Sequence, residues 1–247
     1  MTWVLGAITD TVGAILRRGR DPAVRRTIGY LVAGLASGVG TKAVDDFAGR
    51  MESVTGAVLS ALGSAPALWM LIVVGIAMLE RRSMWLAAVR GSAFFIGLGV
   101  GYYGYSEVML GFSGVGLVLF WMVAALTVVP ALIGLVLWAH DAANDPAGSR
   151  RRRLVGWAVI GAILGLPMIQ LVAYGSASVD GTEESAVSLI NAATQLPIIA
   201  AIWLLLARTW PARLGSLAAG LLLAWPAWLG LELLFRLLIV LTGLTRG

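Results

Sequence analysis

The sequence predicts an all-α polytopic integral membrane protein, a helix bundle of about seven transmembrane helices that begins with an interfacial amphipathic helix. Hydrophobic residues make up 59% of the 247 residues and charged residues only 13%, whereas a soluble domain holds roughly 45–50% apolar and about 25% charged residues. The apolar residues gather in long runs, without the alternating pattern of β-barrel strands. We therefore expect lipid, rather than water, around most of the chain.

Seven apolar runs approach or exceed the about 20 residues that cross a hydrocarbon core of roughly 30 Å. The start of the second run is not fixed by the sequence, because residues 65–79 are short for a span, whereas a start near residue 59 takes in Gly63, Ser64 and Pro66, which are typical of a break. The seventh run is long, and it fits either one tilted helix or a span with an interfacial piece. The runs cover residues 27–49, 65–79, 84–105, 115–139, 154–174, 186–207 and 214–244.

Two of these runs carry local signals for bends or ends. The polar pair Ser106-Glu107 is predicted to form a turn after the third run, with a loop from Gly111 to Gly114. Pro167 lies inside the fifth run, where its missing backbone donor predicts a kink.

Residues 1–26 are predicted to form a separate cytoplasmic segment ahead of a single transmembrane domain at 27–247. Apolar residues from Trp3 to Leu16 recur at helical spacing, and Arg17, Arg18 and Arg20 follow them. Such a helix lies on the membrane surface, where its arginines contact anionic lipid headgroups. A cleaved signal peptide fits less well, because its basic residues precede the apolar stretch.

The basic residues predict the orientation of the chain. With seven crossings, fourteen of the eighteen Lys and Arg residues fall on one side, and cytoplasmic loops are the ones that collect Lys and Arg. The N-terminus is therefore expected in the cytoplasm and the C-terminus outside. The fourteen residues are Arg17, Arg18, Arg20, Arg25, Arg26, Arg81, Arg82, Arg90, Arg150, Arg151, Arg152, Arg153, Arg208 and Arg213.

Composition argues against most catalytic chemistry. The chain has no cysteine and one histidine, His140, so thiolate chemistry, disulfides and His-rich metal sites are not expected. No cofactor or metal is predicted, and we expect no enzymatic activity. The net charge of +5 follows from the arginine-bearing loops and does not indicate nucleic acid. No nucleotide-binding pattern is present, so ATP would act only through a partner protein.

The first candidate binding group is Lys42 with Asp45 and Asp46, in the outer half of the first span. Spacings of three and four residues place all three on one helix face, where they can pair. Charges inside a span are costly and often mark a solute or ion site. The alternative is a span that ends near Gly40, with a solvated cluster after it. The small residues Gly34, Gly38 and Gly40 would allow another helix to approach this one closely.

The second candidate group lies at the outer end of the third span and comprises Tyr102, Tyr103, Tyr105 and Glu107. The rings and the carboxylate would suit an organic cation or a sugar. The alternative is an outer aromatic belt beside a solvated carboxylate.

The third candidate group consists of uncharged amides in two proline-containing spans. Gln170 follows Pro167 in the fifth span, and Asn191 and Gln195 precede Pro197 in the sixth. Interrupted helices with polar groups are typical of transporter sites, although amides in spans also serve to hold neighbouring helices together.

The segment from Val39 to Asp46 and several later residues together resemble an uncharacterised family of bacterial multi-span membrane proteins of unknown function. The resemblance extends over about the first 110 residues and implies a helical membrane fold, without implying any chemistry. We expect the protein in a bacterial inner membrane. The later residues are Trp69, the Arg81-Arg82 turn, Phe94-Phe95 and Tyr102-Tyr103 with Tyr105.

Two functions remain as hypotheses. The first is a membrane transport protein, or the membrane subunit of a transporter, that handles a small polar or cationic solute. The second is a non-catalytic assembly or accessory subunit that packs against other membrane proteins. The expected partners are membrane lipids, a small solute, and either another membrane subunit or a cytoplasmic ATPase.

Overall fold

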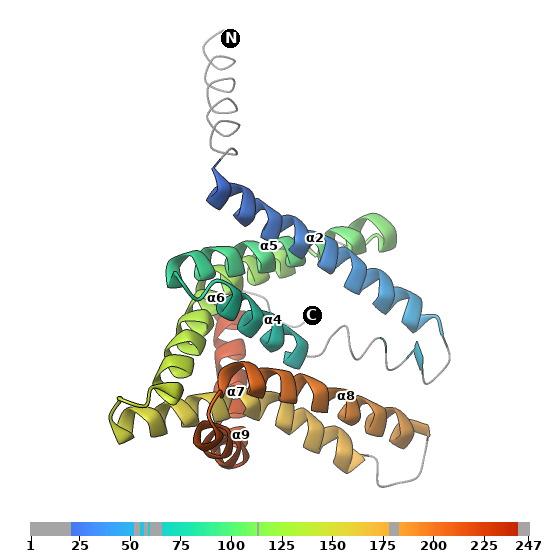
Figure 1. Cartoon of the computed structure of the whole chain (residues 1–247). Coiled ribbons are helices and arrows are strands. Elements are labelled where there is room, and N and C mark those ends of the chain that lie inside the picture. Colours follow the sequence, from blue (N-terminus) through green and yellow to red (C-terminus); the bar gives the residue numbers. More distant parts are fainter. Residues whose placement is uncertain are drawn as a thin grey trace.

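The computed structural model in Figure 1 describes residues 21–51, 55–56, 59, 66–112, 114–177 and 183–241. Within these ranges the chain forms seven helices and no strand, which confirms the all-α prediction. Residues 1–20, which carry most of the predicted interfacial helix, lie outside the described part. The helices are α2 (Pro22–Gly49), α4 (Pro66–Leu79), α5 (Met84–Leu110), α6 (Val115–Asn144), α7 (Arg150–Ala177), α8 (Glu183–Leu206) and α9 (Trp210–Leu241).

Each predicted apolar run corresponds to one of these helices. The largest difference at an N-terminus is in α2, which begins at Pro22, so the predicted boundary between residues 26 and 27 falls inside this helix. Pro22 suits the first helical position because it lacks a backbone donor. The Asp21 side chain caps the helix by accepting the Ala23 N–H at 2.8 Å.

The predicted turn at Ser106-Glu107 is wrong, because α5 continues through both residues to Leu110. Ser106 is tolerated in the helix since its hydroxyl donates to the Tyr102 carbonyl, 3.0 Å away. The helix ends at Gly111, whose φ of 65° places it in the left-handed region that glycine adopts without strain.

Two helices in the described ranges, α5 and α6, are long and apolar enough to cross a membrane. Shorter apolar stretches cover Ala67–Leu79 and Ala193–Leu206. These lengths suggest membrane association, and the number of crossings remains a prediction.

Helices α2 and α5 approach each other through glycines on both sides of the contact. A Cβ atom added at Gly34 or Gly38 would overlap the carbonyl oxygens of Phe94 and Leu98, and one added at Gly97 or Gly101 would overlap backbone atoms of α2. Paired glycines four residues apart permit this backbone contact. The predicted small-residue face is therefore confirmed at Gly34 and Gly38 but not at Gly40, which faces open space.

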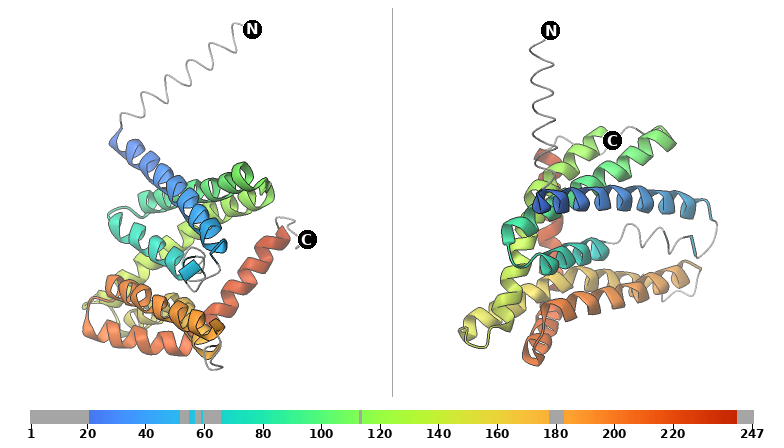
Figure 2. Two further views of the ribbon diagram at one scale, coloured as in Figure 1. Left: turned by 90° about the vertical axis from the view of Figure 1, so that its right-hand side faces the viewer. Right: turned by 45° about the horizontal axis from the view of Figure 1, so that its top comes forward.

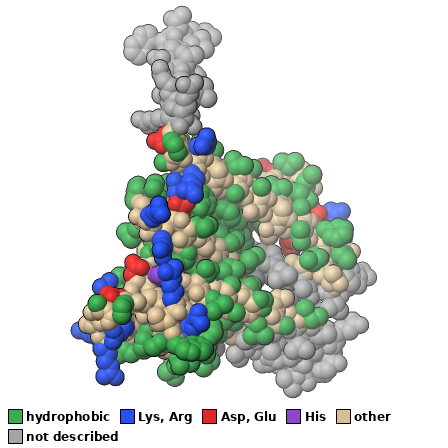
Figure 3. Space-filling view, viewed as in Figure 1, with side chains coloured by type: hydrophobic (Ala, Val, Ile, Leu, Met, Phe, Trp, Pro, Cys, Tyr) green, Lys and Arg blue, Asp and Glu red, His purple; other side chains and the backbone are tan. Residues whose placement is uncertain are grey.

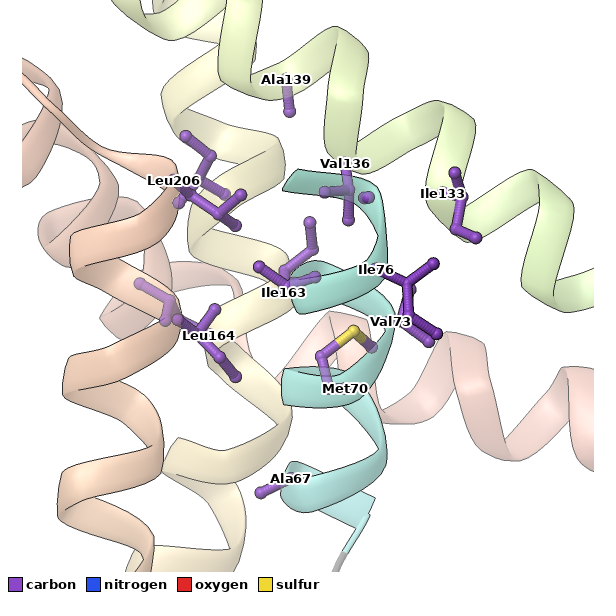
Figure 4. Close-up of a cluster of buried hydrophobic side chains, with 14 of the residues drawn as sticks. Ala67, Met70, Val73, Ile76, Ile133, Val136, Ala139, Ile163, Leu164 and Leu206 are labelled. Atoms are coloured by element: carbon purple, nitrogen blue, oxygen red, sulfur yellow. The ribbon is translucent and has the colours of Figure 1, made fainter. Parts of the chain in front are cut away.

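The apolar core surrounds α4. Figure 4 shows Val73 and Ile76 of α4 near α6, while Ala67 points toward α7 and α8. Leu206 of α8, Leu164 of α7 and Val136 of α6 belong to the same cluster and are fully buried. The two views of Figure 2 show α2 and α5 packed together at one end of the molecule and α7 and α8 at the other, while the last part of α9 runs back from that end.

The turns that carry arginines lie on one side of the molecule. In Figure 1 the start of α2 and the turns between α4 and α5, α6 and α7, and α8 and α9 all lie to the left. Figure 3 shows Lys and Arg side chains along this side and hydrophobic side chains over much of the remaining visible surface. The four arginines at 150–153 form the first turn of α7 rather than a loop, and the Ser149 hydroxyl accepts the Arg152 N–H at 3.2 Å.

Candidate functional site

The charged residues near the end of α2 form two ion pairs within the helix. Lys42 Nζ lies 2.9 Å from Asp45 Oδ2, and Arg50 Nη2 lies 2.7 Å from Asp46 Oδ2. Lys42 and Asp45 are largely shielded from solvent, with 18% and 27% of their side-chain surfaces exposed. The expected pairing of Lys42 with a following aspartate is therefore present for Asp45, while Asp46 pairs with Arg50.

The packing of α2 against α5 brings the first two candidate groups together. The Lys42 ammonium lies 5.3 Å from the centre of the Tyr102 ring, within the range of a cation–π interaction. The Tyr102 and Tyr103 rings meet edge to face at 5.1 Å, and the Tyr103 hydroxyl accepts the Trp121 indole N–H at 2.9 Å. We call Lys42, Asp45, Tyr102, Tyr103 and Trp121 the outer cluster.

The outer cluster already contains a cation. Because Lys42 lies over Tyr102, an organic cation could occupy that ring face only after displacing the lysine. Tyr105 is half-buried and Glu107 is exposed further along α5, and the contacts described here do not join them to the cluster. The described contacts therefore divide the second candidate group, with Tyr102 and Tyr103 in the outer cluster and Tyr105 and Glu107 outside it.

The third candidate group lies in the other half of the molecule. Gln195 is 2% exposed on α8, and the described buried residues on the same helix face are apolar, among them Ile199 and Ile202. The side chains of Gln170 and Asn191 lie outside the described part of the structure.

Sequence reasoning missed a second charged group, at the arginine-bearing ends of α2, α4 and α5. The Arg90 side chain donates from Nη1 to Glu80 Oε2, and these residues are only 3% and 7% exposed. The Tyr30 hydroxyl donates to Glu80 Oε1 at 3.0 Å, and Arg26 Nε lies 3.8 Å from the same oxygen. We call Arg26, Tyr30, Glu80 and Arg90 the inner cluster.

The inner cluster joins three helices in a setting where isolated charges are costly. The sequence placed Arg90 only among the basic residues of the cytoplasmic side, whereas it lies inside α5 and is buried. Its Nε is buried and has no hydrogen-bond partner within the described ranges. The position of Arg90, several residues into an apolar run, was the signal that could have revealed it.

Polar side chains also fasten the turn between α8 and α9. Asn144 Nδ2 donates to the Leu206 carbonyl, and Asn144 Oδ1 accepts the Arg208 N–H, both at 2.8 Å. His140, one turn earlier on α6, is buried with Nδ1 at 3.2 Å from Asp141 Oδ1. Among the described residues, no group of three His, Asp or Glu side chains is placed to hold a metal ion.

These features define an all-helical protein with apolar surfaces and two clusters of charged and aromatic side chains. A model of a family of unknown function, DUF6518, matches residues 17–237. The chain belongs to this family. The matched region is about twice as long as the N-terminal part in which the sequence showed a resemblance. No curated protein and no solved structure matches the chain.

Proposed function

We propose that the protein crosses a bacterial inner membrane seven times, with its N-terminus in the cytoplasm. A core helix of a soluble protein is mostly buried, whereas less than half of the most apolar stretch of α5 and of α6 is buried. Leu119, Val123 and Leu126 of α6 are exposed, as is Val32 of α2. The gathering of the arginine-bearing turns on one side (Figure 3) supports the orientation, because such turns remain cytoplasmic.

Chemical labelling tests this topology. A cysteine introduced at Gly148, beside the four-arginine turn, is expected to react with a membrane-impermeant maleimide in inverted vesicles but not in intact cells. A cysteine at Gly49, at the opposite end of α2, is the matched control and should show the reverse pattern. Because the chain has no cysteine of its own, each signal reports one position. Labelling of Gly148→Cys in intact cells would contradict the orientation.

The proposed function is transport of a small polar solute, by this protein alone or as the membrane subunit of a transporter. The observation that carries it is the buried Glu80–Arg90 ion pair together with the shielded Lys42–Asp45 pair, in a molecule whose surface is largely apolar. Ionisable groups in membrane segments are expensive and commonly belong to solute or ion pathways. A polar solute is favoured over a cationic one, because Lys42 occupies the Tyr102 ring face.

Uptake into proteoliposomes tests the proposal, with a hexose, a zwitterionic amino acid and a polyamine as solutes. Asp45→Asn removes the charge that pairs with Lys42, and we expect uptake to fall about tenfold, which corresponds to about 1.4 kcal/mol. Asp21→Asn is the control, since asparagine also caps a helix, and should leave uptake unchanged. Equal uptake by protein-free liposomes for all three solutes would count against transport.

An assembly role is the second candidate, and one surface of α2 favours it. Gly29, Ala33, Ala36 and Gly40 are exposed along one helix face, and a Cβ added at Gly29 or Gly40 would meet no atom within 4 Å. Small-residue faces of this kind allow another membrane helix to approach closely.

If α2 binds another membrane protein, Ala36→Leu should abolish its co-purification from native membranes. Val32→Leu is the control on the same helix, because Val32 is already a large exposed residue. Co-purification that survives Ala36→Leu, or a solitary protein that transports, would exclude the assembly role.

A further inference from the structure

The described helices fall into two sets of three with matching spacing along the chain. Helices α2 and α7 each contain 28 residues and begin at residues 22 and 150, which are 128 apart. Helices α4 and α8 end at 79 and 206, which are 127 apart, and α5 and α9 begin at 84 and 210, which are 126 apart. We call α2, α4 and α5 the first unit and α7, α8 and α9 the second unit, with α6 between them.

The same spacing relates the glycines that lie between the first and third helices of each unit. Gly34 and Gly38 of α2 lie 127 residues before Gly161 and Gly165 of α7. Gly34 and Gly38 contact the backbone of α5, the third helix of their unit, and Gly161 contacts the backbone of α9 at Ala219 and Gly220. The first and third helices of both units are thus in close backbone contact. Arg81 and Arg208, in the turns before the third helices, are also 127 apart.

The pairing of the first and third helices follows the same rule. In each unit the first and third helices form the most extensive pair, α2 with α5 and α7 with α9. The second helices, α4 and α8, contact each other across the two units, which is compatible with a two-fold relation between the units. Both units begin at the arginine-bearing side, so the relating axis runs along the membrane normal, as in transporters built from parallel repeats.

Each unit is fastened internally at its arginine-bearing end. In the first unit, Arg90 of α5 reaches back to Glu80 at the end of α4. In the second unit, Arg213 Nε of α9 donates to the Ala207 carbonyl at the end of α8, 3.0 Å away. The Trp203 indole N–H also donates to Ser216 Oγ at 3.2 Å and joins α8 to α9. These bonds at the arginine-bearing end and the glycine contacts link the helices of each unit.

The contact between the units has a different chemistry. Ala67 and Val74 lie seven residues apart on one face of α4, and both are fully buried. Figure 4 shows Ala67 directed toward the second unit. Separating α4 from α5 would break the buried Glu80–Arg90 pair, whereas the buried side chains described on α4 and α8 are apolar apart from Gln195.

From this arrangement we infer that the protein is a tandem repeat of two three-helix units, and that the solute passes between them along the α4–α8 interface. Gln195 supplies the hydrogen-bonding group, which suits an uncharged polar solute. Solute sites at the interface between repeats, with one repeat tilting against the other, are typical of such architectures. The claim that a solute passes between the units rests on the proposed transport function. The claim that the two units move apart does not.

Thiol labelling of the full-length protein in detergent tests the motion without any solute. Ala67→Cys and Val74→Cys place a thiol at the interface, and Ser216→Cys places one between α8 and α9 within the second unit. All three positions are 0% exposed, and the chain has no other cysteine. We expect maleimide to label the interface positions about tenfold faster than Ser216→Cys, because opening between units is more populated than opening within one.

Labelling of both interface thiols at the rate of Ser216→Cys would overturn the inference. The comparison uses variants with the melting temperature of the parent protein, and either interface position suffices if the other variant fails to fold. Fast labelling combined with no uptake of any solute would retain the two-unit motion and reject transport. Uptake combined with slow labelling would retain transport and place its path elsewhere.

Discussion

Replacing Glu80 with alanine is expected to destabilise the protein by about 3–5 kcal/mol, the range measured when one partner of a buried ion pair is removed. The change leaves the Arg90 guanidinium, 3% exposed, without its carboxylate. It also removes the acceptor of the Tyr30 hydroxyl. The expected readout is a large fall in the melting temperature of the detergent-solubilised protein.

Two controls make this prediction specific. Glu107→Ala removes an exposed carboxylate and should change stability by no more than about 0.5 kcal/mol. Glu80→Leu combined with Arg90→Met removes both charges, and most of the lost stability should return because apolar residues often replace buried ion pairs without cost. A single Glu80→Ala variant as stable as the parent would show that the ion pair is not buried as described.

Gly38→Ala is expected to disrupt the α2–α5 pair, because the new Cβ would overlap the Leu98 carbonyl oxygen and lie close to the Tyr102 nitrogen. Backbone atoms cannot move aside as a flexible side chain can, so the helices must separate. Overpacking of this kind costs about 1–3 kcal/mol, measured by thermal unfolding. Separation would also move Lys42 away from the Tyr102 ring and so weaken the outer cluster.

Gly40→Ala is the matched control on the same helix. No atom lies within 4 Å of a Cβ at Gly40, and alanine is a better helix former than glycine by about 1 kcal/mol. The control should therefore be as stable as the parent or more stable. Equal effects of the two substitutions would mean that Gly38 does not contact α5.

The helices were predictable from the sequence because long apolar runs and their polar boundaries are local properties. The bounds of α8 match the predicted run to within three residues, and α6 begins at the predicted residue and ends five residues later than expected. The prediction failed at Ser106-Glu107, where a polar pair was taken as a turn although the Ser106 hydroxyl is satisfied within the helix. The helix ends at Gly111, which adopts a left-handed backbone conformation. Glycine favours this conformation, so its presence in the sequence could have indicated the end of the helix.

The contacts between candidate residues were not predictable, because they depend on which helices become neighbours. The Lys42–Asp45 pair follows from spacing along one helix, whereas the position of Lys42 over Tyr102 requires the glycine contact between α2 and α5. In the same way, Glu80 and Arg90 are separated by a turn and a helix start, so their pairing depends on how α4 and α5 pack. Sequence patterns identify charged side chains that are costly to bury, but they do not reveal which residues those side chains pair with.

The start of α7 has an electrostatic consequence of its own. A helix N-terminus carries a partial positive charge, and α7 adds four guanidinium groups within its first turn. Only Arg152 and Arg153 have described partners there, namely Asp145 and the Pro146 carbonyl. This turn is therefore the part of the fold that gains most from surrounding anions, and a bilayer rich in acidic phospholipid should hold α7 more firmly than a neutral detergent does.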